Sequence, residues 1–522
     1  MAPRTGRSAM LVALGIFCSR LAGLVRQRVI AHYFGLSTDA ADAWAAGFKI
    51  PNLLQNLFGE GALSASFIPV YAALVARGER READRVAGAV GALLAVVVSG
   101  LVLAGVFATS WLIDAIAPGF SGDKRALTIT VVRILFPGTS VLVLSAWCLG
   151  ILNSHHRFLL SYAAPVMWSA AMIIALLWFG GATPLPRLVA MLAWASVVGS
   201  LLQFAVQIPV VLRVAPDLRF AIDTTSVEVR TVVRNFFPAF FSRGAVQVSA
   251  YVDTVLASYL PTGAAAGLSN AATLYTLPVS LFGMAVSAAE LPAMANIEAT
   301  DISRHETLRH RLDVGLRRIS FFVIPSAMAF LALGDIVAAA LLQTGRFLHT
   351  DALHVWAILA GSSVGLLAST LGRLYASTYY ALRDTRTPLR YALVRVGFTI
   401  VLGYVCAFPV PRMLGIPAEW GVAGLTVSAG VAGWIEMLLL RRSMNARIGP
   451  TGLPAAYVIK LWAAAACGAI AAWAVKLSIP PLHPVIGAIL VLGPYGVVFC
   501  ACSLALRIPE AQTALARLRR SA

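Results

Sequence analysis

The sequence predicts an all-α polytopic membrane protein with about 14 transmembrane helices, and three observations support this fold class. Hydrophobic residues make up 59% of the 522 residues and charged residues only 12%, against roughly a quarter charged in an ordinary soluble domain. Apolar runs of about 20 residues recur along the chain, a length that spans the roughly 30 Å hydrocarbon core of a bilayer. These runs lack the strict alternation of the roughly ten-residue strands in a membrane barrel. A soluble globular protein is therefore excluded.

The individual spans follow from averaging hydropathy over a window of about 19 residues. In chain order we expect helices at residues 9–34, 43–75, 88–113, 128–152, 160–180, 186–212, 233–260, 265–295, 316–344, 354–381, 390–409, 418–440, 454–475 and 484–506. The first span follows two arginines, as a signal peptide does, but it continues past Arg20 and Arg26 without a small-residue cleavage site. We therefore expect it to be retained as the first helix.

Loop charges predict the orientation of these spans, because Lys and Arg accumulate on the cytoplasmic side of a membrane. With the N-terminus inside, the inner segments hold about 26 arginines, whereas the outer loops hold about six basic residues. An even number of helices with both termini in the cytoplasm accounts for this asymmetry.

Charge and motifs also exclude several classes of function. The net charge of +18 comes mostly from arginines in short loops, without the aromatic platform that stacks bases, so we read it as a topology signal and expect no nucleic-acid partner. The six cysteines show no metal-ligand spacing. No Walker loop, HExxH motif or nucleophile elbow occurs, which favours a transporter without a cofactor over an enzyme. Its energy would come from the membrane potential or a monovalent cation gradient.

The chain contains an internal repeat. Ser19-Arg20 recurs as Ser242-Arg243, and Leu57-Phe58-Gly59 recurs as Leu281-Phe282-Gly283, at almost the same offset. Each Leu-Phe-Gly is followed by a Ser-Ala pair and then by a proline, namely Ser64-Ala65 with Pro69 and Ser287-Ala288 with Pro292. A repeat of six helices is even, so both copies enter the membrane in the same direction and are related by an axis along the membrane normal.

This repeat predicts the domain organisation. We expect an N-lobe of six helices at residues 1–215, a C-lobe of six helices at 216–445, and two further helices with a basic cytoplasmic tail at 446–522. Secondary transporters with parallel repeats bind their substrates between the two halves.

Ionisable residues inside predicted spans are functional candidates, because charges at membrane depth are costly unless they face a cavity or a partner. Besides Arg20, Arg26 and Arg243, these residues are Asp42, Lys49, Glu60, Asp253, Glu290, Arg373, Arg395 and Glu436. Those near span ends have an alternative role, since a long side chain can extend its charge to the interface: this applies to Arg26, Lys49, Arg373, Arg395 and Glu436. A carboxylate at Asp42 can also simply favour the start of a helix.

Arg20 and Arg243 lie well inside their spans at equivalent repeat positions, so we expect both to face a central aqueous cavity. Two guanidinium groups in such a cavity form an anion site that suits phosphate oxygens. Prolines and glycines would bend the second and eighth spans and provide hinges for alternating access, although both residue types are common in membrane helices anyway. These residues are Pro51, Pro69, Pro278, Pro292, Gly59, Gly61 and Gly283.

Several longer motifs resemble a known family. The first is Ser19-Arg20-Leu21-Ala22-Gly23-Leu24-Val25-Arg26, followed by Asp42-Ala43, Phe48-Lys49-Ile50-Pro51-Asn52-Leu53-Leu54 and Glu60-Gly61-Ala62. Others are Ala117-Pro118-Gly119-Phe120, Leu152-Asn153, Arg157-Phe158, Gln343-Thr344-Gly345-Arg346-Phe347 and Asp384-Thr385-Arg386-Thr387-Pro388. With these motifs the chain resembles, over nearly its whole length, the lipid II flippases of the MurJ (MviN) family in the multidrug/oligosaccharidyl-lipid/polysaccharide exporter superfamily.

The resemblance implies a 14-helix exporter whose two lobes enclose a cationic cavity, with a groove beside the last two helices for a lipid tail. Such proteins move the undecaprenyl-pyrophosphate-linked peptidoglycan precursor from the inner to the outer leaflet by alternating access. Family arginines that contact the pyrophosphate correspond to Arg20 and Arg26, with Ser19 beside them. In the same reading, Asp42 and Glu60 set the inward and outward states, with Pro51 and Gly59 as hinge residues.

The chain departs from the family at several expected site residues. Two further cavity arginines correspond to Gln55 and Thr273, so the cavity has lost cationic groups, and Arg243 is our candidate replacement. A sodium site of some members uses acidic and amide side chains. Asp253 would supply the first of these ligands, but the 390–409 span offers no evident second.

We therefore expect a lipid II flippase whose partners are lipid II or a related polyprenyl-pyrophosphate glycolipid, membrane lipids and the cell-wall synthesis machinery. Three alternatives remain open on the sequence. The first is a flippase for another polyprenyl-linked glycan, such as an O-antigen or capsule unit. The second is a cation-coupled drug exporter, which would favour acidic cavity residues and typically 12 helices. The third is a scaffold that binds the lipid without transporting it.

Overall fold

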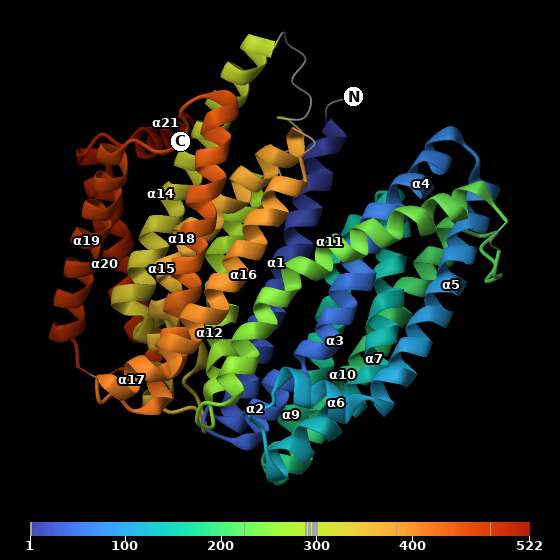
Figure 1. The fold of residues 1–522 in the computed structure, drawn as a ribbon, viewed down its shortest axis with the longest axis horizontal. Helices are drawn as coiled ribbons and strands as arrows, with labels where there is room; N and C mark the ends of the chain where they lie inside the picture. Colours follow the sequence, from blue (N-terminus) through green and yellow to red (C-terminus); the bar gives the residue numbers. More distant parts are fainter. Residues whose placement is uncertain are drawn as a thin grey trace. The chain divides into compact units, whose positions relative to one another are not determined.

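The computed structural model describes residues 3–521 except 224, 288–289, 291–293, 295–300, 383 and 481, and in some stretches, among them 59–61 and 241–250, only the backbone. The described part of the chain is helical and carries a single isolated bridge between Thr344 and Phe347 (Figure 1). The all-α prediction is therefore confirmed.

The chain divides into two compact units. Unit 1 comprises Met1–Ala266 and Thr344–Phe347, and unit 2 comprises Gly267–Gln343 and Leu348–Ala522. The predicted division into lobes at residues 215 and 445 stays a prediction.

Unit 1 contains the helices from the N-terminus to the middle of the chain. They are α1 (Pro3–Phe34), α2 (Asp39–Gly47), α3 (Lys49–Leu54), the π-helix η1 (Gln55–Leu63), α4 (Ser64–Arg77), α5 (Arg80–Phe107), α6 (Thr109–Ile116), α7 (Gly122–Ser154), α8 (Phe158–Ala163), α9 (Pro165–Phe179), α10 (Leu185–Val214) and α11 (Val227–Ser258).

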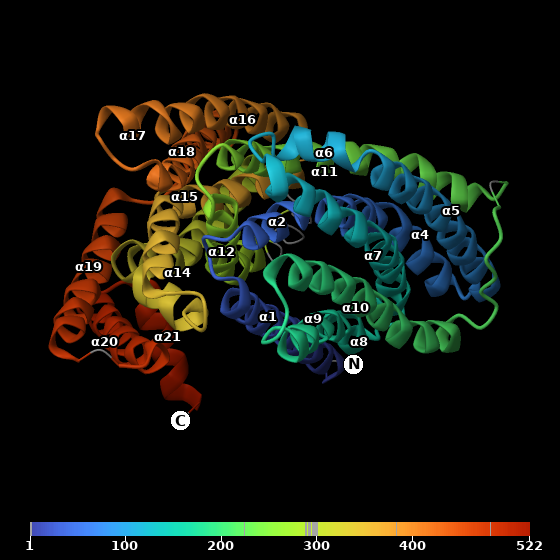
Figure 2. The same ribbon diagram turned by 90° about the horizontal axis from the view of Figure 1, so that it is seen from below.

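Helix α7 forms the centre of unit 1, with α10 on one side and α4 and α5 on the other (Figure 2). Its Trp147 is fully buried and donates a hydrogen bond to the Ala87 carbonyl of α5 at 3.1 Å. On the side toward α10, Ser145 donates to Gln207 at 2.7 Å and accepts from Gln203 at 2.8 Å. These hydrogen bonds join α7 to α10 inside the core, where the Gln203 side-chain oxygen is left without a hydrogen-bond partner.

Unit 2 contains the remaining helices. They are most of α12 (Ala264–Pro278), the π-helix η2 (Val279–Met284), α14 (Asp301–Leu342), α15 (His349–Ala381), α16 (Arg386–Ala407), α17 (Pro409–Met413), the 3₁₀ turn η3 (Ala418–Trp420), α18 (Gly421–Ile448), α19 (Ala455–Ser478), α20 (Pro484–Ala505) and α21 (Pro509–Ser521).

Helix α15 packs between α14 and α18, and small residues allow a close approach at this interface. A Cβ atom added to Gly365 of α15 would lie 2.5 Å from the Cα atom of Gly430 on α18. Helices α19 and α20 pack together and against α14, where the Tyr495 hydroxyl donates to the Pro325 carbonyl at 2.6 Å.

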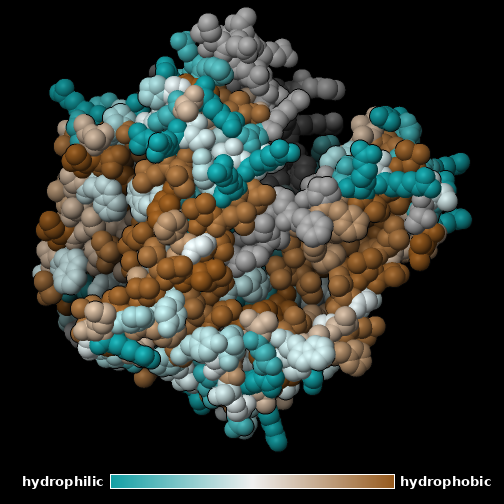
Figure 3. Space-filling model, in the orientation of Figure 1, coloured by the Kyte–Doolittle hydropathy of each residue, from teal (hydrophilic) through white to brown (hydrophobic). Residues whose placement is uncertain are grey.

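Ten helices in the described part of the chain are long and apolar enough to cross a membrane. They coincide with the third to sixth and the ninth to fourteenth predicted spans. In both units the face drawn in Figure 3 carries hydrophobic residues along the middle of the helices and hydrophilic residues near their ends. The chain is thus a multi-pass membrane protein, and the exact count of 14 helices stays a prediction.

The second predicted span is not one helix. Helix α2 ends at Gly47, and α3, η1 and α4 follow in turn. Pro51 accounts for the first break, because its ring clashes with the carbonyl four residues earlier, at Gly47. The third span is also interrupted, at Ala108, where the Thr109 hydroxyl donates to the Gly105 carbonyl at 2.7 Å.

Both copies of the repeated Leu-Phe-Gly motif lie in π-helices. Gly59 lies in η1, and Gly283 lies in η2 directly after Pro278. A π-helical turn is a common cause of bending in a helix, and this one occurs at equivalent positions of the repeat. Pro292 lies outside the described residues.

Candidate functional site

The two α1 arginines lie in different surroundings within unit 1. Arg20 is exposed. Arg26 is half-buried: its guanidinium lies 4.6 Å from the centroid of the Trp168 ring on α9, and its Nη1 donates to the Ser169 hydroxyl at 3.4 Å. A cation over an aromatic face is stabilised by the ring quadrupole, which holds Arg26 in one orientation. Ser19, beside Arg20, is half-buried.

The broken second predicted span supplies another positive charge, Lys49, which contacts α11. Lys49, the first residue of α3, donates a hydrogen bond to Thr254 of α11, and the Tyr251 hydroxyl donates to the Lys49 carbonyl at 2.9 Å. Asp253 also lies within electrostatic range of Lys49. A lysine of the chain itself therefore provides positive charge near the candidate cation ligand Asp253.

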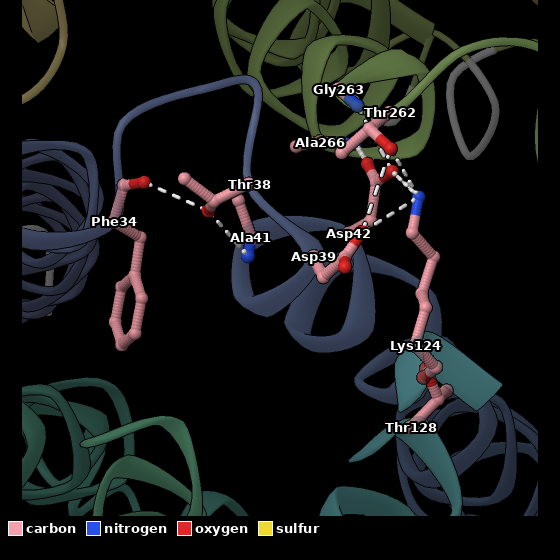
Figure 4. Close-up of polar contacts among 10 residues, drawn as sticks. All are labelled: Phe34, Thr38, Asp39, Ala41, Asp42, Lys124, Thr128, Thr262, Gly263 and Ala266. Carbon is pink, nitrogen blue, oxygen red and sulfur yellow. Dashed lines mark hydrogen bonds and ion pairs between the residues drawn. The ribbon is translucent and has the colours of Figure 1, made fainter. Parts of the chain in front are cut away.

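A buried carboxylate on α2 connects this helix to the starts of α7 and α12 (Figure 4). Asp42 of α2 is only 1% exposed, and its Oδ2 lies 3.0 Å from Lys124 Nζ. Its two oxygens also accept hydrogen bonds from the backbone N–H groups of Gly263 and Ala266, both at 3.0 Å. These groups belong to the start of α12, where a negative charge is favoured by the helix dipole.

Lys124 makes the remaining contacts of this network. Its ammonium also contacts Asp39 at 3.2 Å and donates to the Thr262 hydroxyl at 2.8 Å. Asp39 and Lys124 lie in the first turns of α2 and α7, and Thr262 lies just before α12. The predicted topology places all three between predicted spans, on the outer side. We call this cluster the outer latch: Asp39, Asp42, Lys124, Thr262 and the Gly263 and Ala266 amides.

The family motif at residues 343–347 contacts the end of α1 in the same unit. The Arg346 N–H donates to the His32 carbonyl at 2.9 Å, and the His32 Nδ1 and Thr344 Oγ1 atoms are hydrogen-bonded at 2.9 Å. Gly345 has φ +55°, and a Cβ atom there would lie 2.5 Å from the His32 carbonyl oxygen. Only glycine fits this close approach without strain.

Other predicted site residues are only partly placed. Gln55 is half-buried in η1, whereas Thr273 lies in α12 and donates to the Ser269 carbonyl at 3.0 Å. Pro51 is buried in α3. The side chains of Glu60 and Arg243 and the surroundings of Gly59 lie outside what the structure describes. Among the described residues no cluster of three or more His, Cys, Asp or Glu side chains is placed to bind a metal ion.

Sequence reasoning missed the partners of these groups. In the sequence Lys124 is only one of the basic residues in the predicted outer loops, and nothing marks Trp168, Ser169 or Thr254 as partners of a charge. An aromatic or hydroxyl residue in an apolar helix is normally a packing residue, so only the fold identifies it as the partner of a charge.

Three of the remaining membrane-depth charges, all in unit 2, lie in ion pairs, and the fourth, Arg373 of α15, is exposed. Arg395 Nη1 of α16 lies 3.2 Å from Glu436 Oε2 of α18. Glu290 lies 3.5 Å from Arg311 and 3.8 Å from Arg318 of α14.

Comparisons with known proteins identify the family. The family model described as "Lipid II flippase MurJ" matches residues 30–490. The lipid II flippase MurJ of Burkholderia cenocepacia is 32% identical over 449 residues, which cover 84% of each chain. The probable lipid II flippase MurJ of Vibrio cholerae is 29% identical over 84% of this chain and 82% of its own.

Solved structures agree in fold. A structure of the lipid II flippase MurJ in an inward closed conformation has a TM-score of 0.78 at 22% identity and covers 95% of this chain and 99% of its own. An inward-facing multidrug resistance transporter of the MATE family has a TM-score of 0.64 at 14% identity, over 82% of this chain and 95% of its own. The family match over most of the sequence confirms the resemblance seen in its motifs, and the chain belongs to the lipid II flippase MurJ family.

Proposed function

We propose that this chain moves lipid II, the undecaprenyl-pyrophosphate-linked peptidoglycan precursor, from the inner to the outer leaflet of the bacterial cytoplasmic membrane. Family membership supports this substrate, and the observation that carries the proposal is an exposed arginine, Arg20, within a helix of a membrane-spanning chain. An exposed guanidinium at this depth needs an aqueous cavity or an anionic ligand.

Arg20 and Arg26 would bind the pyrophosphate. Guanidinium groups hold phosphate oxygens through paired, charge-assisted hydrogen bonds. Because Trp168 and Ser169 already orient Arg26, this arginine would lose little freedom when a phosphate binds. Arg243 is our candidate for a third cation, with Ser19, Gln55 and Thr273 as neutral donors around the headgroup.

The outer latch would hold the outer end closed while the cavity is open to the cytoplasm. Opening would separate the Asp42 carboxylate from Lys124 and from the start of α12, which replaces protein partners by water. The π-helices η1 and η2, with Pro51 and Gly59, would bend as the two halves change orientation. Glu60 would help to set the inward and outward states.

Coupling would use the membrane potential or a monovalent cation, with both termini in the cytoplasm. Lys49 lies within electrostatic range of Asp253 and so would compete with a bound cation for this carboxylate. We therefore favour the membrane potential over a sodium ion at Asp253.

Complementation of a bacterial strain depleted of its own lipid II flippase tests this function. Wild type is expected to restore growth. Arg20→Ala and Arg26→Ala should fail to restore it fully, because the loss of a charge-assisted hydrogen bond should lower the transport rate about tenfold or more. Arg187→Ala, at an exposed arginine in the first turn of α10, is the matched control and should behave as wild type. Failure of a correctly inserted wild type would favour another polyprenyl-linked glycan as the substrate.

A further inference from the structure

Unit 2 gathers five polar side chains that the function proposed above does not use. Arg395 of α16 donates through Nη1 to Glu436 Oε2 of α18 at 3.2 Å. The Tyr275 hydroxyl of α12 is hydrogen-bonded to Ser369 of α15 at 2.7 Å and lies within electrostatic range of both Arg395 and Arg373. Arg373 of α15 and Arg395 of α16 are therefore both near enough to the Tyr275 hydroxyl of α12 to interact with it electrostatically.

The two arginines lie at similar depth inside the membrane-spanning segments. Arg373 is eight residues before the end of α15, and Arg395 is nine residues after the start of α16. At 1.5 Å per residue, both lie roughly 12 to 14 Å from the short turn that joins these helices. Neither side chain is long enough to place its charge easily at the membrane interface near that turn. A polar environment inside the membrane-spanning part of the protein therefore explains their positions better.

The charges of this cluster do not balance, because two guanidinium groups share one carboxylate. Arg373 is exposed, whereas the Nε atom of Arg395 is buried and has no hydrogen-bond partner. A buried donor without an acceptor is unfavourable, and an oxygen atom bound to it would remove that cost. The cluster is thus suited to bind an anionic group.

We propose that Arg373, Arg395 and the Tyr275 hydroxyl form a second anion-binding subsite, in unit 2, for a carboxylate or phosphate group of the transported lipid. This inference rests on the proposed function. Glu436 holds Arg395 while the subsite is empty and competes with the incoming anion. The transported precursor offers two sources of such a group, its pyrophosphate and the carboxylates of its stem peptide, and guanidinium forks bind either one.

The test measures lipid II affinity for the full-length protein in nanodiscs. Arg373→Ala should weaken binding about tenfold, the loss of one charge-assisted contact, while Arg373→Lys should retain part of it. Arg390→Ala is the matched control, an exposed arginine on α16 five residues from Arg395, and should bind as wild type. Unchanged affinity of Arg373→Ala would overturn the proposal.

Glu436→Gln separates a binding role from a purely structural ion pair. Removing the competing carboxylate should tighten lipid II binding several-fold, even if the protein becomes less stable to heat. A merely structural pair predicts lower stability without tighter binding, and that result would also overturn the proposal. Because Arg373 is exposed, its variants keep the test decisive if Glu436→Gln fails to fold.

A second ligand distinguishes the two sources of the anion. If Arg373→Ala weakens binding of both lipid II and undecaprenyl pyrophosphate, the subsite takes the pyrophosphate. If it weakens binding of lipid II alone, the subsite takes a carboxylate of the peptide. Wild type that binds neither ligand would contradict the proposed function itself.

Discussion

At the scale of single residues, the two α1 arginines show what spacing can predict. Six residues separate them, which places them about 120° apart around a helix. The structure agrees with this separation, since Arg20 is exposed and Arg26 lies over Trp168. The sequence could not predict which arginine would be packed, because this depends on how α9 lies against α1.

The outer latch leads to a stability prediction. Asp42→Asn would leave two backbone donors with a weaker acceptor, and Lys124 would keep the Thr262 hydroxyl but only one carboxylate partner, the exposed Asp39. We therefore expect a loss of about 1–3 kcal/mol in the free energy of unfolding. Asp39→Asn is the matched control, because Asp39 contacts the same lysine from an exposed position and should cost under about 1 kcal/mol. Thermal unfolding of both purified variants measures the difference, and equal losses would argue against a buried latch.

His155, at the end of α7, leads to a pH prediction. Burial lowers the pKa of this histidine, and Arg80, His156 and Arg157 lower it further. The unfolded chain, with a pKa near about 6.5, then binds the proton more readily than the folded protein. Stability from this group is therefore complete above about pH 6.5 and declines as the pH falls toward the lowered pKa.

Melting temperatures between pH 7 and pH 5 test this prediction. Wild type should lose stability on acidification, and His155→Gln should lose less over the same range, although it weakens the 2.9 Å contact with the Tyr71 hydroxyl. An identical pH dependence in both proteins would show that His155 does not titrate differently on folding.

At the scale of helices, hydropathy predicted where the apolar spans lie better than where they break. The ten apolar helices coincide with predicted spans, whereas the 43–75 and 88–113 spans are each interrupted. The first interruption was foreseeable from Pro51. The second depends on the Thr109 hydroxyl, which bonds to the preceding turn only in one rotamer. Helix α21 was read as a basic tail, because its few apolar residues give little hydropathy.

The α15–α18 interface leads to a packing prediction. Gly365→Ala places a methyl group 2.5 Å from a backbone atom of Gly430, so the helices must move apart, at about 1–3 kcal/mol. Gly433→Ala on α18 meets no atom within 4 Å and should be neutral or slightly stabilising. Thermal unfolding of the two variants in detergent compares them, and similar melting temperatures would contradict a close helix contact.

At the scale of the whole molecule, the internal repeat relates the predicted spans that hold most of the candidate site. The first, second, seventh and eighth spans are equivalent in the repeat and hold Arg20, Arg26, Asp42, Asp253 and Glu290. Ionisable residues inside predicted spans could therefore be identified as candidates from the sequence, whereas the contacts made by each charge required the fold.

The predicted topology and the structure are consistent at one place in unit 1. Asp39, Lys124 and Thr262 lie between predicted spans, in three segments that the count of arginines assigns to the same side of the membrane, and the structure brings them into one network. Which side of the membrane this end faces stays a prediction.

Transport of lipid II in proteoliposomes is the most direct test of the central claim. Purified wild type in vesicles with labelled lipid II should move the label between leaflets, and Arg20→Ala should reduce the rate about tenfold at equal protein incorporation. Arg187→Ala should match wild type. Label that crosses at the same rate with wild type, with Arg20→Ala and with empty vesicles would contradict the account.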